Sequence, residues 1–170
     1  MTLTVKQNAL LQRIQQFTFD DGPVDLPFHV RLARDNGWSA GYTARAITEY
    51  RRFAFIAATA GHPVSPSDPV DQVWHLHLLY TNSYWLRFCQ EVLDMHLHHH
   101  PGTGGSAERA KFDGWYADTL NSYRRCFDAE PPSDLWPAAG TQLKAFTAHQ
   151  RVNIRRCWIV RKPWHLGVSI

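Results

Sequence analysis

The sequence predicts a mostly α fold, a single-domain helical bundle with a histidine-rich loop and an irregular or extended C-terminal tail. Three observations predict it. Apolar residues recur at helical spacing in successive segments, and proline and glycine clusters separate these segments. The chain has 170 residues, of which 44% are hydrophobic and 19% are charged, and this balance suits one folded domain rather than a disordered chain.

Three helices are predicted before the first proline-rich turn. Each combines an apolar stripe at helical spacing with a turn sequence at its end. They cover residues 4–17, 27–36 and 39–60. Pro27 lies at the start of the second helix and Gly37 at its end, whereas Ser39 is the expected N-cap of the third and Gly61 its stop.

Two further helices are predicted in the middle of the chain. The first covers 69–80, with Asp68 as its N-cap and Pro69 as its first helical residue. The second covers 82–94 and has one apolar face. That face consists of Trp85, Phe88, Cys89, Val92 and Leu93. The proline- and glycine-containing stretch that follows predicts a histidine-rich loop.

The last predicted helix of the bundle begins at Ser106. Its stripe consists of Phe112, Tyr116, Leu120, Tyr123 and Phe127. We therefore expect residues 1–137 to form the helical domain. Residues 138–170 are expected to form a C-terminal helix or tail that packs on the domain or links it to a partner. Within this tail, 141–149 fits a short helix and 151–163 an extended segment.

Histidines are concentrated in one part of the chain, since six of the ten lie between residues 75 and 100. A protein metal site needs several imidazoles or carboxylates within about 2.0–2.2 Å of one ion. Asp71 and His75 are four residues apart, so they lie side by side on a helix. The triplet of histidines at 98–100 adds one or two ligands if the segment 82–94 folds back as a hairpin.

His75 and His77 are about 200° apart around a regular helix, so only one of them can face this site. The candidate metal ligands are therefore Asp71, His75, His99 and His100, with His77 as the alternative to His75. Cys89 is a candidate for an additional, softer ligand. The nitrogen and oxygen donors suit a transition metal ion, with zinc or iron first and nickel or copper(II) as alternatives.

These residues are compatible with two functions. The first is a histidine-rich metal-binding site, where a metal-bound water or an open position supports hydrolytic or oxidative chemistry. The second is a non-catalytic protein-interaction module, in which the tryptophan and histidine motif is structural and its polar groups are hydrogen-bonded. In the second interpretation His77 is a hydrogen-bonded core residue and Asp71–His75 a surface pair.

Net charge and cysteine content limit the classes of partner and of cross-link that we expect. A formal net charge of +3 does not indicate nucleic acid, and we interpret the basic, tryptophan-containing tail as a docking arm for an unknown protein partner. Three cysteines without a CxxC spacing argue against a disulfide framework. No run of 18 apolar residues or signal peptide is present, so we expect a cytoplasmic protein without a membrane segment.

The stretch Val70-Asp-Gln-Val-Trp-His-Leu-His-Leu-Leu-Tyr-Thr-Asn-Ser-Tyr-Trp, with the later Phe-Cys and His-His-Pro motifs, resembles the glycine-rich domain-containing protein-like family. Two further stretches, Pro-Pro-Ser-Asp-Leu-Trp-Pro and Trp-Ile-Val-Arg-Lys-Pro, are similar to bacterial members. The resemblance covers about 65–163. It implies no particular reaction. It marks seven positions: Asp71, Trp74, His75, Tyr84, Cys89, His99 and His100.

Overall fold

A computed structural model describes residues 3–100 and 105–139 of the chain. This part of the chain contains five α-helices, one π-helix and no strand, which confirms the mostly α prediction. The elements are α1 (Val5–Gln16), α2 (Phe28–Asn36), α3 (Ala40–Thr59), α4 (Asp68–Leu79), η1 (Asn82–Leu93) and α5 (Ser106–Phe127). The helix predicted at 141–149 and the extended segment at 151–163 lie outside the described residues.

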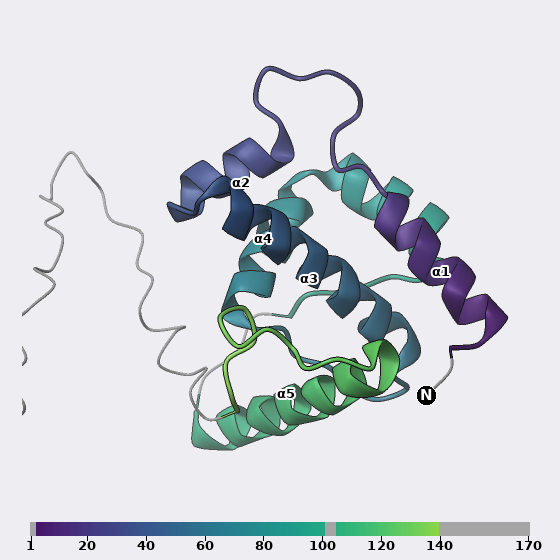
Figure 1. The fold of residues 1–170 in the computed structure, drawn as a ribbon, viewed down its shortest axis with the longest axis vertical. Coiled ribbons are helices and arrows are strands. Elements are labelled where there is room, and N and C mark those ends of the chain that lie inside the picture. Colours follow the sequence, from purple (N-terminus) through teal and green to yellow (C-terminus); the bar gives the residue numbers. More distant parts are fainter. Residues whose placement is uncertain (1–2, 101–104, 140–170) are drawn as a thin grey trace, which may run out of the picture.

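The longest helix before the histidine-rich region, α3, is the centre of the bundle. It contacts α1, α2, α4 and α5 (Figure 1). Its buried side chains follow helical spacing as far as Tyr50, and the four consecutive residues 53–56 are then all buried. None of the helices in the described part of the chain is both long enough and apolar enough to cross a membrane.

A side-chain cap marks the start of three of the six helices in the described part of the chain. The N-caps predicted from sequence include Ser39, whose hydroxyl accepts the backbone N–H of Tyr42. Gly37 ends α2 in the left-handed conformation that glycine adopts without steric cost. The prediction for α4 was wrong by one residue, because Ser67 rather than Asp68 is the N-cap. The Ser67 hydroxyl accepts the N–H of Val70, which places Asp68 in the first turn.

The segment predicted as a regular helix over 82–94 is the π-helix η1. Its buried residues are Ser83, Tyr84, Phe88, Cys89 and Leu93. The predicted inward face was therefore partly wrong, since Trp85 and Val92 are only partly buried and Tyr84 is fully buried. The physical reason is the i→i+5 hydrogen bonding of a π-helix, which puts more residues in each turn than the α-helical period assumes.

His77 lies in the densest aromatic part of the core and is fully buried. Six aromatic rings surround it at centroid distances of 4.8 to 6.0 Å: Phe17, Phe19, Phe28, Tyr50, Tyr84 and Phe88. The Ser83 hydroxyl donates to the Phe19 carbonyl, so its oxygen is free to accept from Nε2 of His77, 3.3 Å away. Nδ1 then accepts from the Tyr50 hydroxyl at 2.9 Å, which satisfies a neutral imidazole at both nitrogens.

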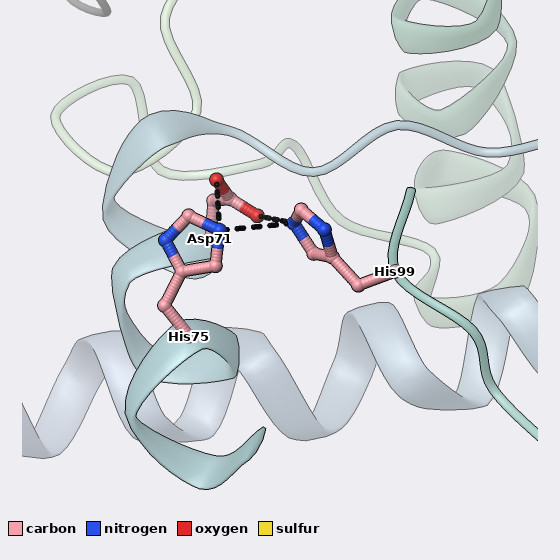
Figure 2. A group of neighbouring side chains, drawn as sticks. All are labelled: Asp71, His75 and His99. Carbon is pink, nitrogen blue, oxygen red and sulfur yellow. Dashed lines mark hydrogen bonds and ion pairs between the residues drawn. The ribbon is translucent and has the colours of Figure 1, made fainter. Parts of the chain in front are cut away.

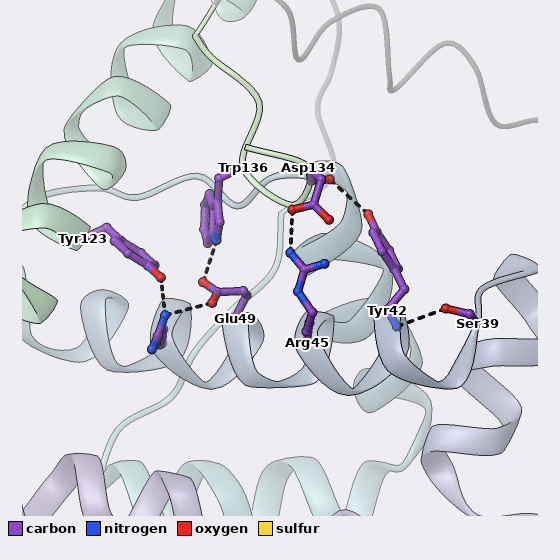
Figure 3. Close-up of polar contacts among 8 residues, drawn as sticks. Ser39, Tyr42, Arg45, Glu49, Tyr123, Asp134 and Trp136 are labelled. Atoms are coloured by element: carbon purple, nitrogen blue, oxygen red, sulfur yellow. Dashed lines mark hydrogen bonds and ion pairs between the residues drawn. The ribbon is translucent and has the colours of Figure 1, made fainter. Parts of the chain in front are cut away.

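A second buried polar cluster attaches the segment after α5 to α3. The carboxylate of Glu49 accepts the indole N–H of Trp136 at 2.9 Å and a guanidinium N–H of Arg52 at 3.0 Å (Figure 3). Arg52 also donates to the Tyr123 hydroxyl. Because Trp136 is buried, this segment belongs to the packed bundle. The domain boundary between residues 137 and 138 stays a prediction.

The burial of His77 predicts a pH-dependent stability. Burial, and secondarily the positive charge of Arg87, lower the pKa of His77 to about 3. The unfolded chain binds a proton on this imidazole below about pH 6.5, and the folded chain does not. Stability is therefore complete above that pH and falls toward pH 3, by up to about 1.4 kcal/mol per pH unit. Urea unfolding of wild type and His77→Gln between about pH 4.5 and 7 should show this slope only in wild type. If the free energies of unfolding of wild type and His77→Gln differ by the same amount at every pH, this prediction is wrong.

The Trp136–Glu49 hydrogen bond can be measured by a double-mutant cycle. Trp136→Phe leaves one oxygen of a buried carboxylate without its donor, and we expect a loss of about 1–3 kcal/mol in the free energy of unfolding. The same substitution in a Glu49→Gln background should cost less, because the charged acceptor is already gone. Chemical denaturation of the four proteins gives the coupling energy, and additivity within about 0.5 kcal/mol would show that the bond contributes little.

Candidate metal centre

Asp71, His75 and His99 converge at one place on the surface of the bundle (Figure 2). Asp71 and His75 come from adjacent turns of α4, and His99 comes from the irregular segment 96–100 that follows η1. Nε2 of His99 lies 2.9 Å from Oδ1 of Asp71 and 3.1 Å from Nε2 of His75. Nε2 of His75 lies 3.4 Å from Oδ2 of Asp71. The sequence-predicted meeting of α4 with the histidine triplet therefore occurs through His99.

The three side chains differ in exposure in a way that suits a site open on one side. The side chain of Asp71 is 8% exposed, that of His99 is 19% exposed and that of His75 is 48% exposed. The carboxylate therefore forms the floor of the site and His75 its rim. A negative charge held this far from water is best compensated by a nearby cation or by several donors.

While the carboxylate of Asp71 is ionised and both rings are neutral, hydrogen bonding alone cannot satisfy all three contacts. Each Nε2 carries either one proton or one lone pair. If both imidazoles donate to Asp71, two N–H groups face each other at 3.1 Å. If only His99 carries the proton at Nε2, the lone pair of His75 faces a carboxylate oxygen at 3.4 Å. With an ionised carboxylate, every protonation pattern of the neutral rings therefore leaves one of the three contacts unfavourable.

A cation between the three atoms removes this conflict, because lone pairs from all three would point toward it. Ligand atoms about 2.0–2.1 Å from a tetrahedral ion are about 3.3 Å from one another. The observed separations of 2.9, 3.1 and 3.4 Å are close to that edge length. Asp71, His75 and His99 are thus a group that could hold a metal ion.

The segment that carries His99 is fastened to α4 by a buried hydrogen-bond chain. The indole N–H of Trp74 donates to the Tyr84 hydroxyl at 2.8 Å, and Tyr84 donates in turn to the backbone carbonyl of Leu97. Burial raises the pKa of Tyr84, so its hydroxyl stays protonated and remains a donor. The Trp74 ring also packs against the ring of His99 at a centroid distance of 4.6 Å. Helical periodicity did not single out Tyr84, whereas the family resemblance marked it without a role.

The other predicted site residues lie elsewhere. His77 points to the opposite side of α4 from His75, and both its ring nitrogens are used in the core. His100 is exposed, with its ring beside that of His98 at a centroid distance of 6.2 Å. Cys89 is fully buried, and burial raises the pKa of its thiol, which disfavours the thiolate that a metal needs. The structure gathers three of the predicted residues and leaves these three apart.

A family model described as UCP032817-like matches residues 11–126, which is more than half of the chain and includes all three residues of the site. No curated protein and no solved structure matches.

The role of Tyr84 as the fastener of segment 96–100 can be tested without any metal. Tyr84→Phe leaves the Leu97 carbonyl without its donor and the Trp74 indole without its acceptor, and we expect a loss of about 1–3 kcal/mol in stability. Amide hydrogen exchange should accelerate in residues 96–100 more than in α3. Tyr80→Phe, at a partly buried tyrosine near the end of α4, is the matched control. Unchanged exchange in segment 96–100 would show that something else holds it.

Proposed function

Because the chain belongs to the UCP032817-like family, and the family region contains the whole convergent site, we propose that this is a metal-binding helical protein. In this proposal Asp71, His75 and His99 hold one divalent transition-metal ion. The observation that carries it is the mutual approach of three possible ligand atoms, within 2.9 to 3.4 Å, which cannot all be hydrogen-bonded to one another while the carboxylate is ionised. The resemblance to the glycine-rich domain-containing protein-like family stays a prediction beside this match.

The donor set favours zinc or iron(II). Two imidazoles and one carboxylate are borderline and hard donors, which suit these ions better than copper(I). Catalytic zinc sites have three protein ligands and one open position, and iron(II) sites with two histidines and one carboxylate keep open positions as well. Such an ion supplies a Lewis acid and a bound water of lowered pKa. Because the ring of His75 is half-exposed, an ion held by the three residues would be accessible to solvent.

A structural role is the second candidate, and the contacts of His99 favour it. Its ring packs on Trp74, and its Nε2 lies 2.9 Å from Asp71, so it joins segment 96–100 to α4 even without an ion. In this interpretation the protein is a non-catalytic interaction module. The two candidates differ in metal content, since only the first requires a bound ion.

Metal analysis of protein purified without an affinity tag separates the candidates. We expect one tightly bound zinc or iron(II) per chain. Asp71→Asn, His75→Ala and His99→Ala should each weaken binding by more than the roughly 10–100-fold that loss of a mere supporting contact costs. His29→Ala, at an exposed histidine on α2, is the matched control and should bind like wild type. At a free-ion concentration of 100 times Kd, the ion should also stabilise the fold by about 2.7 kcal/mol, which a chelator reverses.

Two outcomes would end the metal proposal. One is that zinc, iron(II), nickel and copper(II) all fail to bind stoichiometrically. The other is that the three site variants bind as tightly as His29→Ala. If the variants are instead less stable than wild type in metal-free buffer, with no change in metal content, the structural role is the correct one.

A further inference from the structure

Three histidines of the cluster are not used by the Asp71 site. Along segment 96–100, burial alternates: Leu97 is buried and His99 partly buried, whereas His96, His98 and His100 are exposed. We call these three exposed residues the outer histidines. Alternation with a period of two is the behaviour of extended backbone, in which successive side chains point to opposite faces. The segment therefore presents His99 to α4 and the outer histidines to the other side.

The rings of the outer histidines form a row. The centroids of His96 and His98 are 5.8 Å apart, and those of His98 and His100 are 6.2 Å apart. Two imidazoles that bind one ion through nitrogens at about 2.0–2.1 Å have centroids roughly 4.5 to 5.2 Å apart at square-planar to tetrahedral angles. The rings of His96 and His98 are about 1 Å farther apart than this, so a small rotation of these two exposed side chains would let them share an ion.

The outer row rests on Trp85, which η1 leaves only partly buried. The Trp85 ring lies 6.0 Å from that of His96 and 5.5 Å from that of His98, centroid to centroid. These contacts hold the two rings on the same side of the segment. The shift of the inward face of η1 from Trp85 to Tyr84 therefore has two effects: Tyr84 fastens Leu97 from inside, and Trp85 supports the outer histidines from outside.

We propose that two of the outer histidines, His96 and His98, form a second metal-binding site. Its all-imidazole donors suit copper(II), nickel or zinc, whereas the carboxylate-containing site suits zinc or iron(II). Binding is weaker than at Asp71, since exposed side chains lose rotamer freedom when they converge on an ion. The proposal is independent of the proposed function, because no residue is shared between the two sites.

Titration of the full chain, without an affinity tag and freed of metal by a chelator that is then removed, with nickel(II) or copper(II) chloride tests this. We expect two calorimetric binding events in wild type, and loss of the weaker one alone in His96→Ala/His98→Ala. In His75→Ala/His99→Ala the tighter event should disappear and the weaker one remain. His29→Ala controls for general loss of an exposed histidine. Circular dichroism of each variant confirms that it is folded, which is expected because the outer histidines are exposed.

Tryptophan fluorescence locates the second event independently. Copper(II) quenches an indole that lies within a few ångströms, so the weaker event should quench Trp85, and Trp85→Phe should abolish that part of the quenching. Trp74→Phe should remove quenching by the tighter event instead, because Trp74 packs on His99. The proposal is overturned if the weaker event and its quenching persist in His96→Ala/His98→Ala. It is also overturned if wild type shows a single binding event and His75→Ala/His99→Ala removes it. Failure of the tighter event alone would count only against the Asp71 site.

Discussion

The hydroxyl of Tyr84 is the contact on which the histidine region depends. It accepts from Trp74 on α4 and donates to the Leu97 carbonyl, so one buried group connects α4, η1 and segment 96–100. Fixing Leu97 fixes the direction of its neighbours as well, because side chains alternate along an extended segment. His99 then faces α4, and His96, His98 and His100 face solvent. A single buried hydrogen-bond chain thus sorts four histidines onto two faces.

Helix α4 separates two histidines in the same way, through its own geometry. His75 and His77 differ by about 200° around the axis, so one lies at the rim of the surface site and the other inside the aromatic core. Both nitrogens of His77 are satisfied by Tyr50 and Ser83, which makes burial of a neutral imidazole tolerable. His75 keeps its ring half-exposed and available. Identical residues two positions apart therefore have different chemistry because they have different environments.

The proposed ion would also connect parts of the chain that are distant in sequence. His99 is 28 residues from Asp71 and 24 from His75, and the donors meet only in the folded protein. Because the unfolded chain offers no such preformed site, binding energy would appear as folding energy. Without an ion, the three close polar atoms would instead lower the stability of the fold, because one of their contacts is unfavourable while the carboxylate is ionised.

The sequence by itself determined what depends on neighbouring residues. Helical spacing and caps such as Ser39 and Gly37 located the helices, and the four-residue spacing of Asp71 and His75 placed them side by side. The two-residue separation of His75 and His77, about 200° around the helix, excluded a shared site for them. Only the tertiary structure decided which histidine of 98–100 meets α4, and that η1 turns Tyr84 rather than Trp85 inward. These outcomes depend on the π-helical hydrogen bonding of η1 and on the Tyr84 hydroxyl, which connects three segments. Local propensity specifies neither, because both result from contacts between residues far apart in the chain.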